Sequence, residues 1–201
     1  MTLLCVDTET TGLELENHCI WQISGIFKKG DMEDRFNFKM KPFRGDPIDA
    51  SAFVKTGVSQ KELETYPDQK EAFEAFISLL NKYGTAEDGS LEKIFVVGYN
   101  VKFDMDFINQ WFEYNGVSKI WWRHIYWPYI DVMALAATYY MTKRSEFENF
   151  RLTTVYKYVF GKDFENAHSA DADVEATWDL FRYLYSRMVI NTEIKTRQIS
   201  K

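Results

Sequence analysis

The pattern of hydrophobic and polar positions predicts three strands at the start of the chain. Residues 2–7 form an apolar run that is typical of a buried strand, and segments 19–30 and 34–42 follow it. The last segment alternates, with Phe36 and Phe38 on one side and polar residues between them. Alternation with a period of two is the pattern of a half-buried strand. The three segments together therefore predict antiparallel strands with hairpin connections.

Helical spacing of apolar residues dominates the rest of the chain. Ser59 and Glu62 form a capping-box pattern at the start of one helix, and Asp131 is a candidate N-cap of another. The expected helices cover residues 59–66, 68–84, 103–116, 131–141, 151–161 and 169–188, and a second buried strand covers 93–100. Residues 120–131 are an aromatic stretch that fits no single element, and a further strand within it stays open as an alternative.

This order of elements predicts one α/β domain in which helices pack around a mixed sheet. We expect the domain to span residues 1–188, and residues 189–201 to form a polar, flexible C-terminal tail. A chain of 201 residues is long enough to bury one sizeable core. No internal repeat or low-complexity linker divides the sequence further.

Charge and cysteine content narrow the possible functions. A formal charge of −6 argues against a general nucleic-acid coat protein, which would be basic, but not against an enzyme that contacts nucleic acid through metal ions. Two cysteines, Cys5 and Cys19, are too few for a disulfide framework. Neither a signal peptide nor an apolar stretch of transmembrane length is visible. We therefore expect an intracellular, cytoplasmic protein without membrane contact.

Acidic residues stand at the end of the first predicted strand. Asp7 and Glu9 are two positions apart, and residues at that spacing share one face of a strand. Both carboxylates therefore point the same way at the carboxyl edge of a buried strand, where α/β proteins keep their sites. The ordinary alternative is an exposed strand end with both acids solvated.

Two further acidic pairs, Asp104 with Asp106 and Asp171 with Asp173, open predicted helices, and His168 precedes the second pair. Acids stabilise helix N-termini, which explains either pair taken alone. Considered together, oxygen ligands of this kind suit Mg²⁺ or Mn²⁺. Carboxylates that converge from two strand ends and a helix could hold two such ions for phosphodiester hydrolysis. His168 would then be the natural general base.

The three acidic groups resemble the motifs of the DEDDh-type 3′–5′ exonucleases, above all the epsilon-type, DnaQ-like proofreading exonucleases of bacterial replicative polymerases. The matching segments are DTETTG (7–12), NVKFDMDFI (100–108) and HSADAD (168–173), in the same order and at suitable separations. The resemblance spans residue 3 to about residue 185. It implies an RNase H-like fold with a five-stranded mixed sheet, in which three antiparallel strands precede the parallel ones.

The resemblance also implies a role for each acidic residue. The metal ligands would be Asp7, Glu9, Asp104 and Asp173, and they would hold two Mg²⁺ or Mn²⁺ ions. His168 would be the general base. Asp106 and Asp171 would be bystanders, although Asp171 is chemically equivalent to Asp173 if the helix begins elsewhere.

Substrate contacts follow from the same resemblance. The residues implied are Thr10, Thr11, Gly12, Leu13, Asn100 and Phe103. The backbone of Thr10 and Thr11 would meet the terminal nucleotide, while Asn100 would order the second motif or a phosphate. Leu13 would be an apolar wedge between the last two bases, unless it packs in the core. Phe103 fits either a core position or a wall of the base pocket.

Two positions depart from the pattern of many family members. Tyr99 stands where a histidine is common, and Thr56-Gly57-Val58 stands in place of His-Gly-Ile. Both positions would touch substrate rather than metal, so they bear on substrate preference. The aromatic residues of the stretch, which are Trp121, Trp122, Tyr126, Trp127 and Tyr129, are candidates for base stacking, core packing or a protein partner.

The leading hypothesis is a divalent-metal-dependent 3′–5′ exonuclease that shortens single-stranded DNA and releases nucleoside 5′-monophosphates. An exoribonuclease similar to ribonuclease T or oligoribonuclease is the first alternative, because a sequence does not reveal whether a pocket admits a 2′-hydroxyl. A non-catalytic polymerase-docking module is a remote alternative, since such a module would have lost acids that are all present here. A calcium-binding module is weaker still, because no contiguous D-x-D-x-D-G loop exists.

Possible partners are single-stranded DNA 3′ ends, RNA, and a polymerase or another replication or repair protein. The polar segment after the last predicted helix is short, which favours a stand-alone enzyme or one with a small partner site.

Overall fold

The computed structural model describes residues 1–44, 47–164 and 169–199. Its centre is one five-stranded sheet in the order β3-β2-β1-β4-β5. The strands are β1 (Thr2–Thr10), β2 (Ile20–Lys29), β3 (Met32–Lys39), β4 (Ile94–Gly98) and β5 (Ile125–Asp131). The pairs β1–β2 and β2–β3 are antiparallel, whereas β1–β4 and β4–β5 are parallel. The sheet therefore has the mixed order that the sequence predicts.

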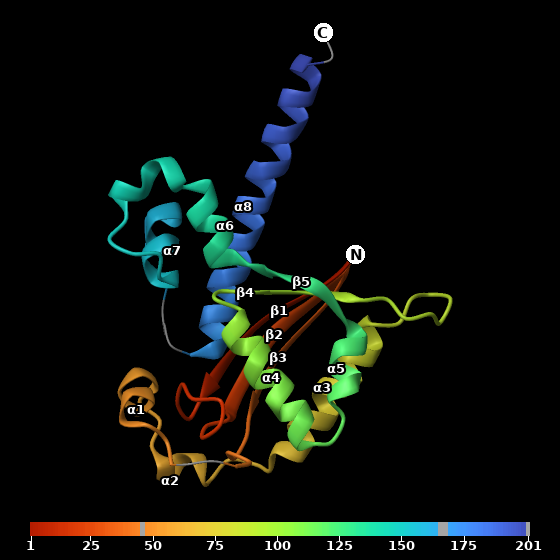
Figure 1. Ribbon diagram of the computed structural model, residues 1–201, viewed down its shortest axis with the longest axis vertical. Helices are drawn as coiled ribbons and strands as arrows, with labels where there is room; N and C mark the ends of the chain where they lie inside the picture. The colour runs from red at the N-terminus through yellow and green to blue at the C-terminus, as the bar shows by residue number, and fades with distance from the viewer. Residues whose placement is uncertain (45–46, 165–168, 200–201) are drawn as a thin grey trace.

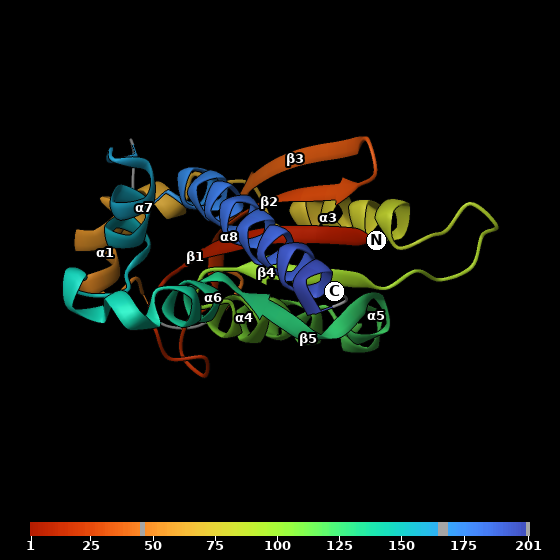
Figure 2. The same ribbon diagram turned by 90° about the horizontal axis from the view of Figure 1, so that it is seen from above.

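Helices cover both faces of this sheet (Figures 1 and 2). The helices are α1 (Ala50–Thr56), α2 (Gln60–Leu63), α3 (Gln69–Tyr83), α4 (Lys102–Tyr114), α5 (Ser118–His124), α6 (Val132–Tyr139), the 3₁₀-helix η1 (Met141–Glu146), α7 (Leu152–Phe160) and α8 (Ala170–Ile199). Helices α3, α4 and α5 pack on one face, and α6, α7 and α8 pack on the other. None of the helices in the described ranges has the length and apolar character needed to cross a membrane.

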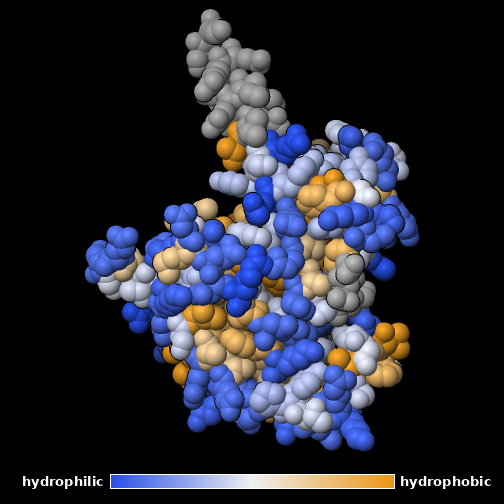
Figure 3. Space-filling view, turned by 180° about the vertical axis from the view of Figure 1, so that it is seen from behind, coloured by the Kyte–Doolittle hydropathy of each residue, from blue (hydrophilic) through white to orange (hydrophobic). Residues whose placement is uncertain are grey.

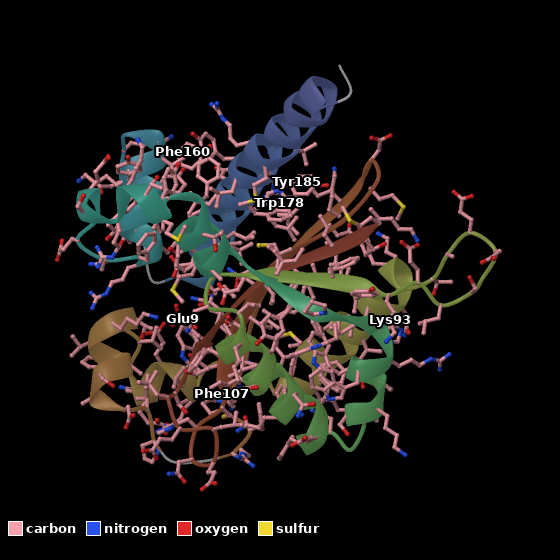
Figure 4. All side chains as sticks on the ribbon, turned by 45° about the horizontal axis from the view of Figure 1, so that its top comes forward. Glu9, Lys93, Phe107, Phe160, Trp178 and Tyr185 are labelled. Atoms are coloured by element: carbon pink, nitrogen blue, oxygen red, sulfur yellow. The ribbon has the colours of Figure 1, made fainter. Side chains whose placement is uncertain are left out.

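Strand β1 divides its side chains between two cores. Leu4 and Val6 join the core under α3 and α4, whereas Leu3 and Cys5 join the core under α8. This alternation is the normal geometry of a strand that is buried on both faces. Figure 4 shows the same division farther out, with Phe107 on α4 and Trp178 on α8 on opposite sides of the sheet. The free thiol of Cys5 is buried, as expected.

Local signals in the sequence correspond to the observed helix ends. The Ser59 hydroxyl accepts a hydrogen bond from the Glu62 backbone N–H at the start of α2. The Asp131 carboxylate accepts bonds from Met133 and Ala134 at the start of α6. Both N-caps were predicted from the sequence, because short polar side chains satisfy the free backbone donors at a helix start.

Two segments differ from the sequence-based expectation in extent. The aromatic stretch divides into α5 and the edge strand β5, so the further strand exists. Helix α8 continues to Ile199 and therefore extends into residues 189–201, the segment assigned above to a tail. Figure 1 shows this end of α8 projecting from the body of the molecule. The division into domain and tail stays a prediction.

Most of the aromatic residues pack into the two cores on either side of the sheet, and a dense group of them surrounds Phe76. Phe76 of α3 is fully buried. Its ring lies 5.5–6.2 Å, between centroids, from the rings of Phe27, Phe36, Trp111, Phe112 and Trp121. The aromatic cluster thus joins β2, β3, α3, α4 and α5 into one unit.

The face seen in Figure 3 is mostly hydrophilic, with apolar residues in small groups.

Truncation of Phe76 tests this arrangement. We expect Phe76→Ala to lower the free energy of unfolding by about 3 to 5 kcal/mol, because it removes a buried ring and leaves a cavity. Phe53→Ala is the matched control, since the Phe53 side chain is 45% exposed. Urea denaturation followed by tryptophan fluorescence measures both. Equal losses in the two variants would contradict the assignment of Phe76 to the core.

Candidate active site

The carboxyl end of β1 carries the first two acids of the site. Asp7 and Glu9 lie on the face of β1 that also carries Leu3 and Cys5, the face covered by α8. Glu9 is 3% exposed, and Figure 4 shows it beside α1. The solvated strand end that served as the ordinary alternative is therefore wrong for Glu9.

Asp173 meets these two residues from the start of α8. One carboxylate oxygen from each of Asp7, Glu9 and Asp173 lies within 4.8 Å of the others. Asp173 is buried and sits in the first turn of α8, the helix that lies against β1 and β2. Residues that are far apart in the sequence thus form one carboxylate cluster.

Asp104 adjoins the cluster from the other face of the sheet. It is buried in the first turn of α4. The backbone N–H and the side-chain hydroxyl of Thr8 both donate to Asp104 Oδ1, each at 2.8 Å. Because Thr8 stands between Asp7 and Glu9, this double hydrogen bond fixes α4 against the strand that carries the first two acids.

Burial and mutual repulsion raise the pKa values of Asp7, Glu9 and Asp104. Burial raises the pKa of Asp7 well above its ordinary value, and the nearby charges of Asp104, Asp173 and Glu9 raise it further. Burial also raises the pKa of Asp104 to about 7, although the two bonds from Thr8 lower it. Burial raises the pKa of Glu9 to about 7, partly offset by Lys55. Keeping these carboxylates ionised without a bound cation therefore costs free energy.

The donor set fits a divalent cation of the Mg²⁺ or Mn²⁺ type. All of its atoms are carboxylate oxygens, which such ions prefer. Glu9 Oε1 is buried and accepts no hydrogen bond from the described part of the chain. A buried acceptor of this kind carries a large desolvation cost unless a proton or cation meets it. Bound cations would therefore add positive charge beside Asp7, Glu9 and Asp173.

The two acids treated as bystanders lie outside the carboxylate cluster. Asp106 pairs with Lys102 on the exposed side of α4. Asp171 is exposed and accepts a hydrogen bond from the Ser169 hydroxyl. His168, the expected general base, lies outside the described residues, so its role stays a prediction.

A cavity of about 300 Å³ opens beside Glu9. Its lining is Thr8, Glu9, Thr10, Gly12, Leu13, Ser51, Ala52, Lys55, Thr56, Asn100 and Phe103. Five of the six residues expected to contact substrate are in this set. Thr11 is not in this set. It is fully buried, its backbone N–H donates to the Cys19 carbonyl, and its own carbonyl accepts from the Asp49 N–H.

The structure shows the surroundings of Leu13 and Phe103, for which both core packing and substrate contact were possible. The Leu13 side chain is 74% exposed, so it does not pack in the core. Phe103 combines a cavity wall with core packing, because it lines the cavity and also packs against Phe107 with ring centroids 4.7 Å apart. Asn100 has a positive φ of 59°, and its backbone N–H donates to Asp131 Oδ1 at 3.1 Å.

A larger cleft of about 820 Å³ opens on the Asp7 side of the cluster. It is lined by Asp7, Lys55, Tyr99, Asn100, Met133, Phe150, Arg151, Leu152, Thr153 and Asp173. The Tyr99 hydroxyl donates to the Phe150 carbonyl at 2.6 Å, so this departure from the family pattern ties β4 to the wall of the cleft. Thr56, the other departure, lines the smaller cavity at the end of α1.

The aromatic stretch stands apart from both cavities. Trp121 is fully buried in the core under α3 and α4, whereas Trp127 on β5 is 66% exposed. None of its five aromatic residues is among the described residues that line either cavity. Core packing is therefore correct for Trp121, and the structure offers no support for base stacking by the stretch at this site.

Two contributors to the site were not found from the sequence. Thr8 lies between the two acids of the first motif and has no role in the sequence-based hypothesis, yet its hydrogen bonds hold Asp104. Lys55 lines both cavities, and its Nζ lies 3.8 Å from Glu9 Oε2. Its position directly before Thr56-Gly57, a segment already expected to touch substrate, was the available signal.

The raised carboxyl pKa values predict how stability depends on pH and metal. A carboxyl group with a folded pKa above its unfolded value favours folding at low pH, and that contribution is lost as pH rises through the folded pKa. For Glu9 these values are about 7 and 4.5. We expect the melting temperature in EDTA to fall from about pH 5 to about pH 8, and Mg²⁺ to raise it at pH 8 by roughly 5 °C.

Asp7→Asn provides the control, because it removes one of the repelling charges and keeps the side-chain volume. Its melting temperature in EDTA at pH 8 should exceed that of the wild type, and its response to Mg²⁺ should shrink. Differential scanning fluorimetry across the pH range measures all of these values. A wild-type curve that is flat in EDTA and unmoved by Mg²⁺ would argue against a metal-binding cluster.

The chain is similar to known proteins both in sequence and in fold. The sequence model of the exonuclease family matches residues 4–181. DNA polymerase III PolC-type of Bacillus cereus is 28% identical over 177 residues, which is 88% of this chain and 11% of that protein. The Listeria monocytogenes protein of the same name is 30% identical over 184 residues, which is 89% of this chain and 11% of that protein. The chain thus spans about a ninth of the length of these relatives.

Solved structures show the same fold. Escherichia coli exonuclease I in complex with a dT13 oligonucleotide aligns with a TM-score of 0.74 at 21% identity, over 96% of this chain and 43% of that chain. A moderately thermophilic exonuclease I from Methylocaldum szegediense aligns with a TM-score of 0.69 at 20% identity, over 92% of this chain and 40% of that chain. Because the family match covers most of the sequence and agrees with the motifs and the sheet order, the chain belongs to the exonuclease family.

Proposed function

We propose that the chain is a divalent-metal-dependent 3′–5′ exonuclease that hydrolyses single-stranded DNA from its 3′ end and releases nucleoside 5′-monophosphates. The convergence of Asp7, Glu9 and Asp173 beside a nucleotide-sized cavity is the observation that carries this proposal. Small-ligand sites typically have volumes of about 300 to 1,000 Å³, and both cavities at the cluster fall in that range.

In this proposal some residues of the chain bind metal or nucleotide, and another accepts a proton. Asp7, Glu9, Asp104 and Asp173 would hold two Mg²⁺ or Mn²⁺ ions. Ions bound there would activate the attacking water and stabilise the leaving oxygen. The cavity beside Glu9 would receive the terminal nucleoside, with Leu13 at its exposed rim and Phe103 in its wall.

His168 would accept the proton of the attacking water as the new phosphorus–oxygen bond forms. The bond from phosphorus to the 3′ oxygen of the preceding nucleotide breaks, and that oxygen takes up a proton. The products are a nucleoside 5′-monophosphate and a strand that is one nucleotide shorter with a free 3′-hydroxyl.

Single-stranded DNA is the preferred substrate in this proposal. Support comes from the fold shared with an exonuclease I that was solved with an oligonucleotide of deoxythymidine, and from relatives that are DNA polymerases. An exoribonuclease activity is the alternative, because a 2′-hydroxyl alone distinguishes the substrates. A polymerase or another replication or repair protein is the proposed kind of partner, which places the activity inside the cell.

Digestion of 5′-labelled single strands tests the proposal directly. With Mg²⁺ or Mn²⁺ we expect a ladder that shortens from the 3′ end, faster for DNA than for RNA of the same sequence. EDTA should stop it, and Asp7→Asn should lower the rate by at least about a hundredfold, because the ligand set loses a charge. An undiminished rate in EDTA or in Asp7→Asn would refute metal-dependent cleavage at this site.

Variants of the third motif separate metal binding from proton transfer. We expect Asp173→Asn to lose both Mn²⁺ affinity and turnover, since Asp173 belongs to the carboxylate cluster. His168→Ala should lower kcat by roughly a hundredfold or more and leave Mn²⁺ affinity within about twofold. Isothermal titration with Mn²⁺ and single-turnover kinetics provide the two readouts.

Asp171→Asn is the matched control for Asp173→Asn, because Asp171 is an exposed acid on the same helix turn. It should keep both Mn²⁺ affinity and turnover. If Asp171→Asn abolished activity and Asp173→Asn did not, the assignment of the ligand would be wrong.

A further inference from the structure

Lys55 occupies a place between the two cavities at the carboxylate cluster. It lines both of them, together with Asn100. It lies near the end of α1, and the residue before that helix is fixed to the end of β1, because the Asp49 backbone N–H donates to the Thr11 carbonyl at 2.7 Å. The turn that follows the first two acids therefore also positions Lys55.

The contact between Lys55 and Glu9 is weak enough to be exchanged for another. Nζ lies 3.8 Å from Glu9 Oε2, and the Lys55 side chain is 51% exposed. Ion pairs at such distance and exposure contribute little free energy because water screens them. When a cation neutralises Glu9, this pairing loses most of its attraction, and the ammonium group is available to a second anion.

Charge balance indicates what that anion is. Two divalent cations offset the charges of the four carboxylates, so the negative charge of an incoming phosphodiester is left to be met by the protein. Among the described residues that line the smaller cavity, Lys55 is the one cation. A lysine ammonium binds phosphate well as a compact point charge.

We propose that Lys55 binds the phosphate of the terminal nucleotide, which is the scissile phosphate in the substrate and the 5′-phosphate in the product. This inference rests on the proposed function and adds to it a phosphate-recognition residue. It also distinguishes Lys55 from a mere counter-ion of Glu9, because a counter-ion would affect the cluster whether or not a phosphate is present.

Binding of the reaction product tests this role without turnover. Affinities for thymidine 5′-monophosphate and for thymidine are measured by isothermal titration in Mg²⁺, for the wild type and for Lys55→Met. We expect Lys55→Met to weaken binding of the monophosphate roughly tenfold or more, and to leave thymidine within about twofold. Lys55→Arg should retain most of the monophosphate affinity, since it keeps the charge.

Lys61→Met is the matched control, because Lys61 is an exposed lysine on the neighbouring helix α2 and lines neither cavity. It should bind both ligands like the wild type. Equal weakening of monophosphate and thymidine in Lys55→Met would mean a structural role and overturn the inference, as would unchanged binding of both.

The strand-digestion assay keeps this outcome separate from the proposed function. Wild-type protein that shortens DNA from the 3′ end while Lys55→Met binds monophosphate normally would overturn the Lys55 inference alone. Wild-type protein that neither shortens DNA nor binds the monophosphate would overturn both.

Discussion

Repulsion among buried carboxylates is the constraint on which the site depends. Asp7, Glu9 and Asp173 present oxygens within 4.8 Å of one another. Asp104, which is hydrogen-bonded to Thr8 of the same strand, adds a negative charge that acts on Asp7. Left free, such groups would separate, enter water or take up protons. They stay together because each is carried by an element whose own position is fixed by burial. Burial and proximity also raise the pKa of Asp7, Glu9 and Asp104, and a bound divalent cation would offset both the lost hydration and the repulsion.

The architecture supplies these fixed positions from both faces of one strand. Helix α4 belongs to the core that contains Phe76 and Trp111, and it brings Asp104 to Thr8. Helix α8 belongs to the core that contains Trp178, and it brings Asp173 to Asp7 and Glu9. The three clustered carboxylates meet on the α8 face, and Asp104 joins them only from the α4 face. The proposed set of four ligands therefore requires a central strand that is covered by helices on both sides.

Features that depend on local chemistry are predictable from the sequence. The caps at Ser59 and Asp131 and the pairing of Asp7 with Glu9 on one face depend on neighbours along the chain, so spacing reveals them. The extent of α8 and the separate surroundings of Trp121 and Trp127 depend on contacts between distant segments. Lys55 was missed for the same reason. Helix α1 has seven residues and buries none of them, so it leaves no apolar periodicity to detect.

The lack of buried residues in α1 also distinguishes it from the elements that carry the proposed metal ligands. The residues proposed to bind metal lie on β1, α4 and α8, elements anchored in the two cores, and precise placement of ligands requires such support. Lys55 and Thr56 lie instead on a short helix that is tied to the β1 turn through a backbone bond from Asp49. Elements with few buried contacts open at low free-energy cost. Under the proposed function, opening of α1 would let a nucleotide enter and leave while the carboxylates stay in place. The proposed recognition of the phosphate and the proposed chemistry at phosphorus would then lie on parts of the fold that differ in how many of their residues are buried.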